Sequence, residues 1–215
     1  MSLVLAIIAV SLVAGFAAGG KLRRFEHLPV HWWGIALAGL ALQGIPVRDG
    51  SQAVAALVGS YVLLLAFTWV NRRLVAAPLL LIGLSLNLLV VAPNEGMPVS
   101  AAAVRSLGAT ASLPSVGAVG KHHLQSSEDM FGVLGDTIPV PDPFGVVLSI
   151  GDVFLYAGVA VFVVSVMLGR PGVNRRPPSH LVQMYRGKHL HRGRRPHHSD
   201  ARQEPVPAAA GQWGT

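Results

Sequence analysis

The sequence predicts an all-α fold, a polytopic membrane helical bundle of five transmembrane helices with an extended, partly helical outer loop and a disordered basic tail. The chain contains five long apolar runs, and the segments between them alternate between rich and poor in Lys and Arg. Of its 215 residues, 52% are hydrophobic and 13% are charged, whereas soluble domains carry roughly 25% charged residues. Such a chain needs lipid to cover its apolar surface.

The distribution of positive charge predicts the orientation. Lys and Arg number three in residues 21–31, one in 48–52, two in 71–73, two in the long segment 93–143, and nine after residue 168. Cytoplasmic loops retain Lys and Arg. We therefore expect the basic segments inside, the N-terminus outside, the C-terminal tail inside, and an odd number of spans in a bacterial cytoplasmic membrane.

The first apolar run, residues 3–19, has two interpretations. A cleaved signal peptide is one, because Ala17, Ala18 and Gly19 are small enough for a processing site. The other is an N-out membrane anchor. No Lys or Arg precedes the run, and a basic cluster beginning at Lys21 follows it, so the sequence favours the anchor.

Four further runs complete the expected transmembrane domain, residues 1–168. Trp32 and Trp33 open the second run, as suits indoles at the lipid headgroups. The turn 71–73 joins the third and fourth runs into an expected antiparallel hairpin. The fifth is expected to begin after Pro143, since proline is tolerated in the first turn of a helix. These spans are 32–47, 53–70, 74–92 and 144–168.

The outer loop, residues 93–143, is longer than most unstructured connections. We expect one helix from Ser100 to Gly108, and a second capped by Ser127 with Glu128 and Asp129 in its first turn, where carboxylates are favoured. Between them, the Ser/Gly/Ala-rich stretch 106–120 is expected to be flexible.

The tail, residues 169–215, lacks the apolar mass to bury a core and is expected to be largely disordered. A short helix around 179–185 is expected on the inner leaflet. The positive charge lies next to a span rather than on a folded basic domain, which favours anionic lipid headgroups and not nucleic acid as its partner. The chain has no Cys and so no disulfide or thiolate metal site.

Two polar residues within the expected spans are candidates for a site. Asp152 is expected about two turns into the fifth span, where a carboxylate in hydrocarbon costs about 3 kcal/mol. It is either functional or an interfacial residue that caps the helix. Asn87, near the outer end of the fourth span, is explained most simply by an interhelical hydrogen bond.

Other candidates surround these two at the outer face and complete a polar cluster. Adjacent His122 and His123 diverge on a helix, and no HExxH motif is present, so a bound metal is a minority interpretation and no cofactor is expected. A histidine paired with Asp136 or Asp152 is favoured instead. No partner base for Ser149 is identifiable. The full candidate cluster is Asn87, Asn94, Lys121, His122, Asp136, Ser149 and Asp152.

Several motifs carry a resemblance: Asn94–Val99, Lys121-His122, Leu134–Pro139 and Ser149–Asp152. Together with Asn87 they resemble a family of small multi-pass proteins from actinobacteria and related bacteria that is classified as a domain of unknown function. The resemblance covers about residues 1–168. It implies a membrane protein of four to five helices with this outer loop as its signature, and it implies no activity.

Two functions are therefore expected as alternatives. The first is a non-catalytic, partner-binding or assembly component of the membrane, either with a protein partner or as a homo-oligomer, because few charged residues lie in the spans. The second is a small membrane enzyme or carrier with an outer-face pocket of Asp152, Asp136 and His122, which could hold a metal. Whether the protein is an enzyme is left open by the sequence.

Overall fold

The structure of the chain, a computed structural model, describes residues 3–28, 30–44, 50–108 and 121–172. The predictions for the tail beyond residue 172, including the helix at 179–185, and for most of the stretch 106–120 lie outside the described residues.

The described residues are mostly helical. Three helices are long and apolar enough to cross a membrane: α3 (Gly50–Val70), α4 (Ala77–Asn94) and α6 (Ile150–Met167). Two apolar helices are shorter, α1 (Leu3–Ala17) and α2 (Trp33–Gly44). A helix needs about 20 residues to cross a bilayer. The three long helices indicate membrane association by length and composition.

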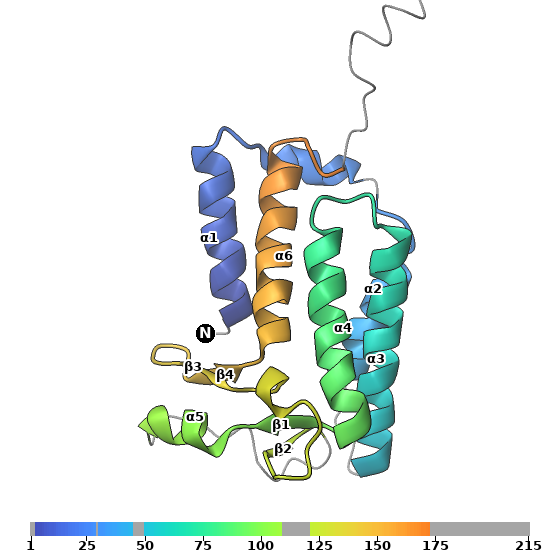
Figure 1. Cartoon of the computed structure of the whole chain (residues 1–215). Coiled ribbons are helices and arrows are strands. Elements are labelled where there is room, and N and C mark those ends of the chain that lie inside the picture. The colour runs from blue at the N-terminus through green and yellow to red at the C-terminus, as the bar shows by residue number, and fades with distance from the viewer. Residues whose placement is uncertain (1–2, 29, 45–49, 109–120, 173–215) are drawn as a thin grey trace, which may run out of the picture. The chain divides into compact units, whose positions relative to one another are not determined.

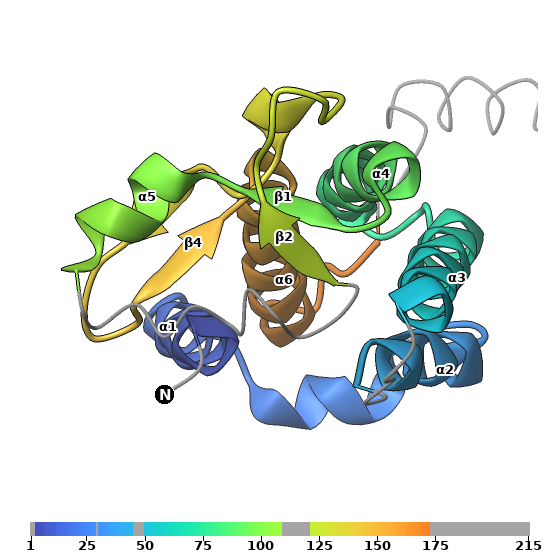
Figure 2. The same ribbon diagram turned by 90° about the horizontal axis from the view of Figure 1, so that it is seen from below.

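The five apolar helices stand side by side in the spatial order α1, α6, α4, α3 and α2. Helix α6 therefore lies between the first helix and the fourth, although it comes last in the chain (Figure 2). The turn 71–76 joins α3 and α4 into the antiparallel hairpin that the sequence predicts. The main hydrophobic core lies between α3, α4 and the strand that follows α4, and includes Leu57, Leu84, Val90, Val91 and Met97.

Glycines bring α4 and α6 into close contact. A Cβ built on Gly83 would lie 2.6 Å from the Gly151 carbonyl oxygen, and one on Gly158 would lie 2.6 Å from a methyl carbon of Leu80. Small residues at such positions let helix backbones approach closely, which is how helices associate where lipid removes the hydrophobic driving force.

The basic segments meet at one end of the helices. The 3₁₀ helix η1 (Leu22–His27) lies near the end of α6, where the Lys21 N–H donates to the Met167 carbonyl at 2.9 Å. The buried Asn71 side chain exchanges two hydrogen bonds of 2.9 Å with the His31 backbone, and the Val75 N–H donates to the Pro171 carbonyl. The described parts of segments 21–31, 71–73 and 168–172 therefore lie together (Figure 1).

The opposite end is covered by a folded segment that we call the cap, residues 95–108 and 121–149. Strands β1 (Met97–Val99) and β2 (His122–Leu124) pair in parallel, and β3 (Ile138–Val140) and β4 (Val146–Leu148) pair antiparallel. Helix α5 (Ala101–Ser106) and the 3₁₀ helix η3 (Gly132–Leu134) complete it. Figure 1 shows these elements below α1, α6 and α4.

The structure corrects two predictions in this region. The fifth helix does not begin after Pro143. The Pro141–Gly145 segment makes a tight turn with Gly145 at φ 58°, β4 returns along β3, and α6 begins at Ile150. The second loop helix is also absent, because Asp129 accepts a hydrogen bond from the Ser126 N–H across a turn. By contrast, the helix expected from Ser100 to Gly108 is present as α5, and the Ser100 hydroxyl caps it by accepting from the Ala103 N–H.

Candidate functional site

The site begins with the first turn of α6. Ser149 is the N-cap: its hydroxyl accepts from the Asp152 N–H at 3.0 Å, and the Asp152 Oδ2 accepts from the Ser149 N–H at 3.1 Å. This reciprocal capping box satisfies two N–H groups that have no partner within the helix. Asp152 is thus in the first turn of α6, not two turns into a span, and it performs the capping role that the sequence offered as one interpretation.

Asn87 of α4 joins this capping box. Its amide Nδ2 donates to Asp152 Oδ1 at 2.8 Å, and its Oδ1 accepts from the Ser149 hydroxyl at 3.0 Å. Asn87 and Ser149 are almost fully buried. Gly151 makes room for the amide, because a Cβ there would lie 1.9 Å from Asn87 Oδ1. The three side chains form one interhelical network, in which both polar ends of the Asn87 amide are paired.

Tyr61 of α3 extends the network and was not singled out from the sequence. It is 8% exposed, and its hydroxyl interacts with the Asn87 side chain and with the charge of Asp152. Tyr156, one turn after Asp152 on α6, is also within the field of that carboxylate. A tyrosine inside an apolar run was the available signal, since a buried tyrosine hydroxyl usually finds a polar partner.

His122 and Asp136 form a second pair, held by the cap. His122 is the first residue of β2, opposite Met97 on β1. Asp136 bridges to β1 through its backbone, because its N–H donates to Pro98 and its carbonyl accepts from Ser100. This placement brings His122 Nε2 to 3.7 Å from Asp136 Oδ2. The sequence predicts a histidine hydrogen-bonded to Asp136 or Asp152; His122 does lie beside Asp136, but at a distance of an ion pair rather than of a hydrogen bond.

Burial is the largest cause of the pKa shifts of both His122 and Asp136. Burial, together with the nearby Asp152 charge, raises the pKa of Asp136 to about 7. Burial also lowers the pKa of His122, aided by Lys121 and His123 and opposed by Asp152. Both shifts favour the uncharged forms. Asp136 therefore changes charge near neutral pH in the folded protein, and Asp152 acts electrostatically on both members.

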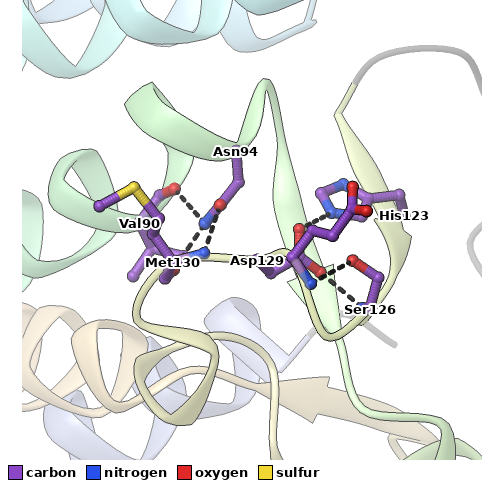
Figure 3. Close-up of polar contacts among 7 residues, drawn as sticks. Val90, Asn94, His123, Ser126, Asp129 and Met130 are labelled. Atoms are coloured by element: carbon purple, nitrogen blue, oxygen red, sulfur yellow. Dashed lines mark hydrogen bonds and ion pairs between the residues drawn. The ribbon is translucent and has the colours of Figure 1, made fainter.

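The two remaining candidates make other contacts. The Lys121 ammonium donates to the Gln43 carbonyl at the end of α2, which ties the cap to that helix. Asn94, in the last turn of α4, donates from Nδ2 to the Met130 carbonyl at 2.7 Å and accepts at Oδ1 from the Met130 N–H at 2.8 Å. We call this pair of bonds the Asn94 latch (Figure 3).

A turn next to the latch is ordered by Asp129. Its carboxylate accepts from the Ser126 N–H at 2.6 Å and lies 2.9 Å from His123 Nε2, as Figure 3 shows. Although burial opposes it, hydrogen bonding from Ser126 and the contact with His123 lower the pKa of Asp129. His123 thus pairs with Asp129 while its neighbour His122 pairs with Asp136. Adjacent residues of a strand point to opposite faces, so the two imidazoles serve separate contacts.

The chemistry available to these groups follows from their partners. The Ser149 hydroxyl donates to an amide oxygen rather than to a base, which does not activate it as a nucleophile. Among the described residues, no three His, Asp or Glu side chains converge as metal ligands. Asn87, Ser149 and Asp152 form a hydrogen-bond network that joins α4 to the start of α6. His122 and Asp136 form a second pair beside them.

Comparison with known proteins identifies the family of the chain, and that family has no known activity. No curated protein and no solved structure matches the chain. A family model does match, over residues 30–164, which contain α2, α3, α4, the cap and most of α6. The matched range is narrower than the resemblance seen in the sequence, and it leaves out α1 and the tail. All seven candidate residues lie within it. The chain therefore belongs to the family of unknown function DUF5317.

Proposed function

We propose that this protein is a multi-pass component of a bacterial cytoplasmic membrane, with its N-terminus outside and its tail inside. All five apolar helices are spans in this proposal. The gathering of segments 21–31, 71–73 and 168–172 at one end supports it, because their Lys and Arg residues then face one side, as the positive-inside rule requires. The short helices α1 and α2 are accommodated by local thinning of the bilayer.

Reporter fusions test this orientation. Fusions after Ser115 should report an external location, and fusions at Asp200 should report a cytoplasmic one. The reverse result at either position would overturn the topology.

We further propose that the protein acts as a non-catalytic, partner-binding or assembly subunit, with the cap as its contact surface. One observation carries this function: the cap is fastened to the bundle by its polar groups while large apolar side chains on its turn remain exposed. Val133 is 77% exposed, Met130 54% and Phe131 47%. Exposed apolar groups that gather on a surface mark interaction sites.

Site-specific photocrosslinking in cells tests the surface. A photoreactive residue at Val133 should give a discrete protein adduct, of a second copy or of another membrane protein. The same residue at Arg105, an exposed polar position of the cap, is the matched control and should not. The double variant Phe131→Ser, Val133→Ser should no longer bind the partner but should keep the parent's thermal stability in detergent. Adducts to lipid alone at Val133 would contradict the proposal.

A second function, a small membrane enzyme or carrier, is favoured by one specific observation. The field of Asp152 reaches both Asp136 and His122, which pair at 3.7 Å. Such a cluster suits proton exchange with a ligand at the outer face. Elemental analysis and mass spectrometry of the purified protein distinguish the two functions. A stoichiometric metal or small molecule that is lost in Asp136→Asn would support this alternative and displace the first.

A further inference from the structure

A groove on the side of the bundle runs between α1 and α6. It has a volume of about 560 Å³, within the roughly 300–1,000 Å³ of typical ligand sites. Its walls are almost entirely apolar, with Val10 and Ala14 on α1 and Val161 and Val164 on α6. The hydroxyls of Ser11 and Ser165, which also line it, are occupied by backbone carbonyls of their own helices.

The extent of the groove matches one leaflet of a bilayer. On α6 it runs from Ala160 to Leu168, which at 1.5 Å per residue is about 12 Å. Half of a hydrocarbon core of about 30 Å is about 15 Å. The groove occupies the half of α6 nearer the basic end, where Lys21 contacts Met167. An acyl chain lying along the helices would fill it from the bilayer centre to the headgroups.

A positive charge stands at the headgroup end of the groove. Arg170 lines the groove two residues after Leu168 and is exposed. No hydrogen bond or ion pair joins its side chain to the residues that the structure describes. The neighbouring Arg24 is used differently, since its guanidinium donates to the Met167 carbonyl. Arginine binds phosphate through two parallel N–H donors. An anionic group above the groove would therefore meet the exposed Arg170 guanidinium.

We propose that this groove binds an anionic phospholipid, with an acyl chain between α1 and α6 and the phosphate on Arg170. The groove is lined by residues outside the cap, and its basic residue, Arg170, is the second residue of the segment 169–215. The assignment of the groove to the cytoplasmic leaflet rests on the orientation proposed above, whereas lipid binding itself does not. Apolar walls with one terminal guanidinium fit a molecule with a long apolar chain and an anionic head.

Native mass spectrometry of the full chain, released from micelles that contain phosphatidylglycerol and phosphatidylcholine, tests the proposal. The parent should retain one phosphatidylglycerol in preference to phosphatidylcholine. Arg170→Gln should reduce that retention several-fold, and Ala14→Phe, which fills the groove, should reduce retention of both lipids. The matched controls are Arg23→Gln, an exposed arginine at the same end, and Ala9→Phe, an exposed α1 position outside the groove. Both should behave as the parent.

Four outcomes would overturn the proposal. Equal loss in Arg170→Gln and Arg23→Gln would indicate general attraction to the basic end. Lipid retention that disappears in 0.5 M salt in every variant would indicate binding by the tail, because screening acts on exposed charges. Thermal stabilisation by inorganic phosphate equal to that by phosphatidylglycerol would indicate an anion site that binds no acyl chain. A change of oligomeric state in Ala14→Phe, with lipid retention intact, would make the groove a subunit interface. Reporter fusions remain the independent test of orientation.

Discussion

Asn87 Nδ2 of α4 donates a hydrogen bond to Asp152 Oδ1 of α6 at 2.8 Å, although the two residues are 65 positions apart. The same carboxylate caps α6 through the Ser149 N–H. One side chain therefore both caps α6 and joins it to α4. Interhelical hydrogen bonds in membrane proteins contribute about 0.6–2 kcal/mol each. The cap ends at Ser149, directly after β4, so these bonds also join the end of the cap to α4.

Asp152→Ala should lower thermal stability in detergent and expose the cap to protease. It leaves the Asn87 amide and the Ser149 N–H without an acceptor, and an unsatisfied buried donor costs about 1–3 kcal/mol. Asp152→Asn retains one acceptor oxygen and should be milder. Asp142→Ala, an exposed cap position, is the control. Parent-like behaviour of both Asp152 variants would show that the carboxylate faces water and does not fasten the helices.

Gly151→Ala should destabilise the bundle by about 1–3 kcal/mol, the usual range for overpacking. The new methyl group would lie 1.9 Å from Asn87 Oδ1 and must displace the amide or separate α4 from α6. Gly34→Ala in α2, where a Cβ meets nothing within 4 Å, should be neutral or slightly stabilising. Thermal melting of both variants in the same detergent is the measurement. Equal melting temperatures would contradict the close helix contact.

Stability should fall as pH rises from about 4 to about 7, because of Asp136. Burial raises its pKa from 3.8 to about 7, so its contribution is complete at low pH and is lost as the carboxylate ionises in the folded protein. The loss is on the order of a few kcal/mol. Asp136→Asn should abolish this decline, and Asp142→Asn should retain it. Melting temperatures measured from pH 4 to 8 test this prediction. An equal decline of the melting temperature in Asp136→Asn would contradict the assignment of the decline to Asp136.

The contribution of His122 to stability has the opposite pH dependence, and the same series of melting temperatures separates it from that of Asp136. Its pKa is lowered by burial, so its contribution is present above pH 6.5 and is lost as pH falls. In the Asp136→Asn background, the remaining loss at acid pH should disappear when His122→Gln is added. A residual acid loss in the double variant would assign it to other groups.

Asn94→Ala should release the turn that carries Phe131 without unfolding the helices. The variant loses both hydrogen bonds of the Asn94 latch to the Met130 backbone. Chymotrypsin should then cut after Phe131 several-fold faster, and the melting temperature should change little. Glu128→Ala changes an exposed position on the same turn, and chymotrypsin should cut this variant at the parent rate. Unchanged cutting in Asn94→Ala would mean that other contacts hold the turn.

Truncation after Arg176 should leave an inserted, folded protein. The removed residues lack the apolar mass to contribute a core, and the insertion signals lie upstream. Carbonate extraction and thermal melting check insertion and folding respectively. Recovery of the truncated chain in the soluble or aggregated fraction would refute the prediction.

The sequence determined the features that depend on local composition. Apolar runs predicted the apolar helices, the stretch from Ser100 predicted a helix where α5 lies, and Asn87, a polar residue in an apolar run, predicted an interhelical hydrogen bond. Each signal is complete within a few residues, because helix propensity, capping and the cost of burying a polar group in lipid are local properties.

The tertiary structure decided what depends on distant partners. Val146–Leu148 is as apolar as the helix that follows it, and pairing with Ile138–Val140 makes it a strand and delays α6 to Ile150. Asn94 binds Met130 rather than joining the Asp152 cluster, and Tyr61 reaches Asn87 from another helix. Strand pairing and side-chain packing are set by contacts between segments far apart in the chain, so no local pattern encodes them.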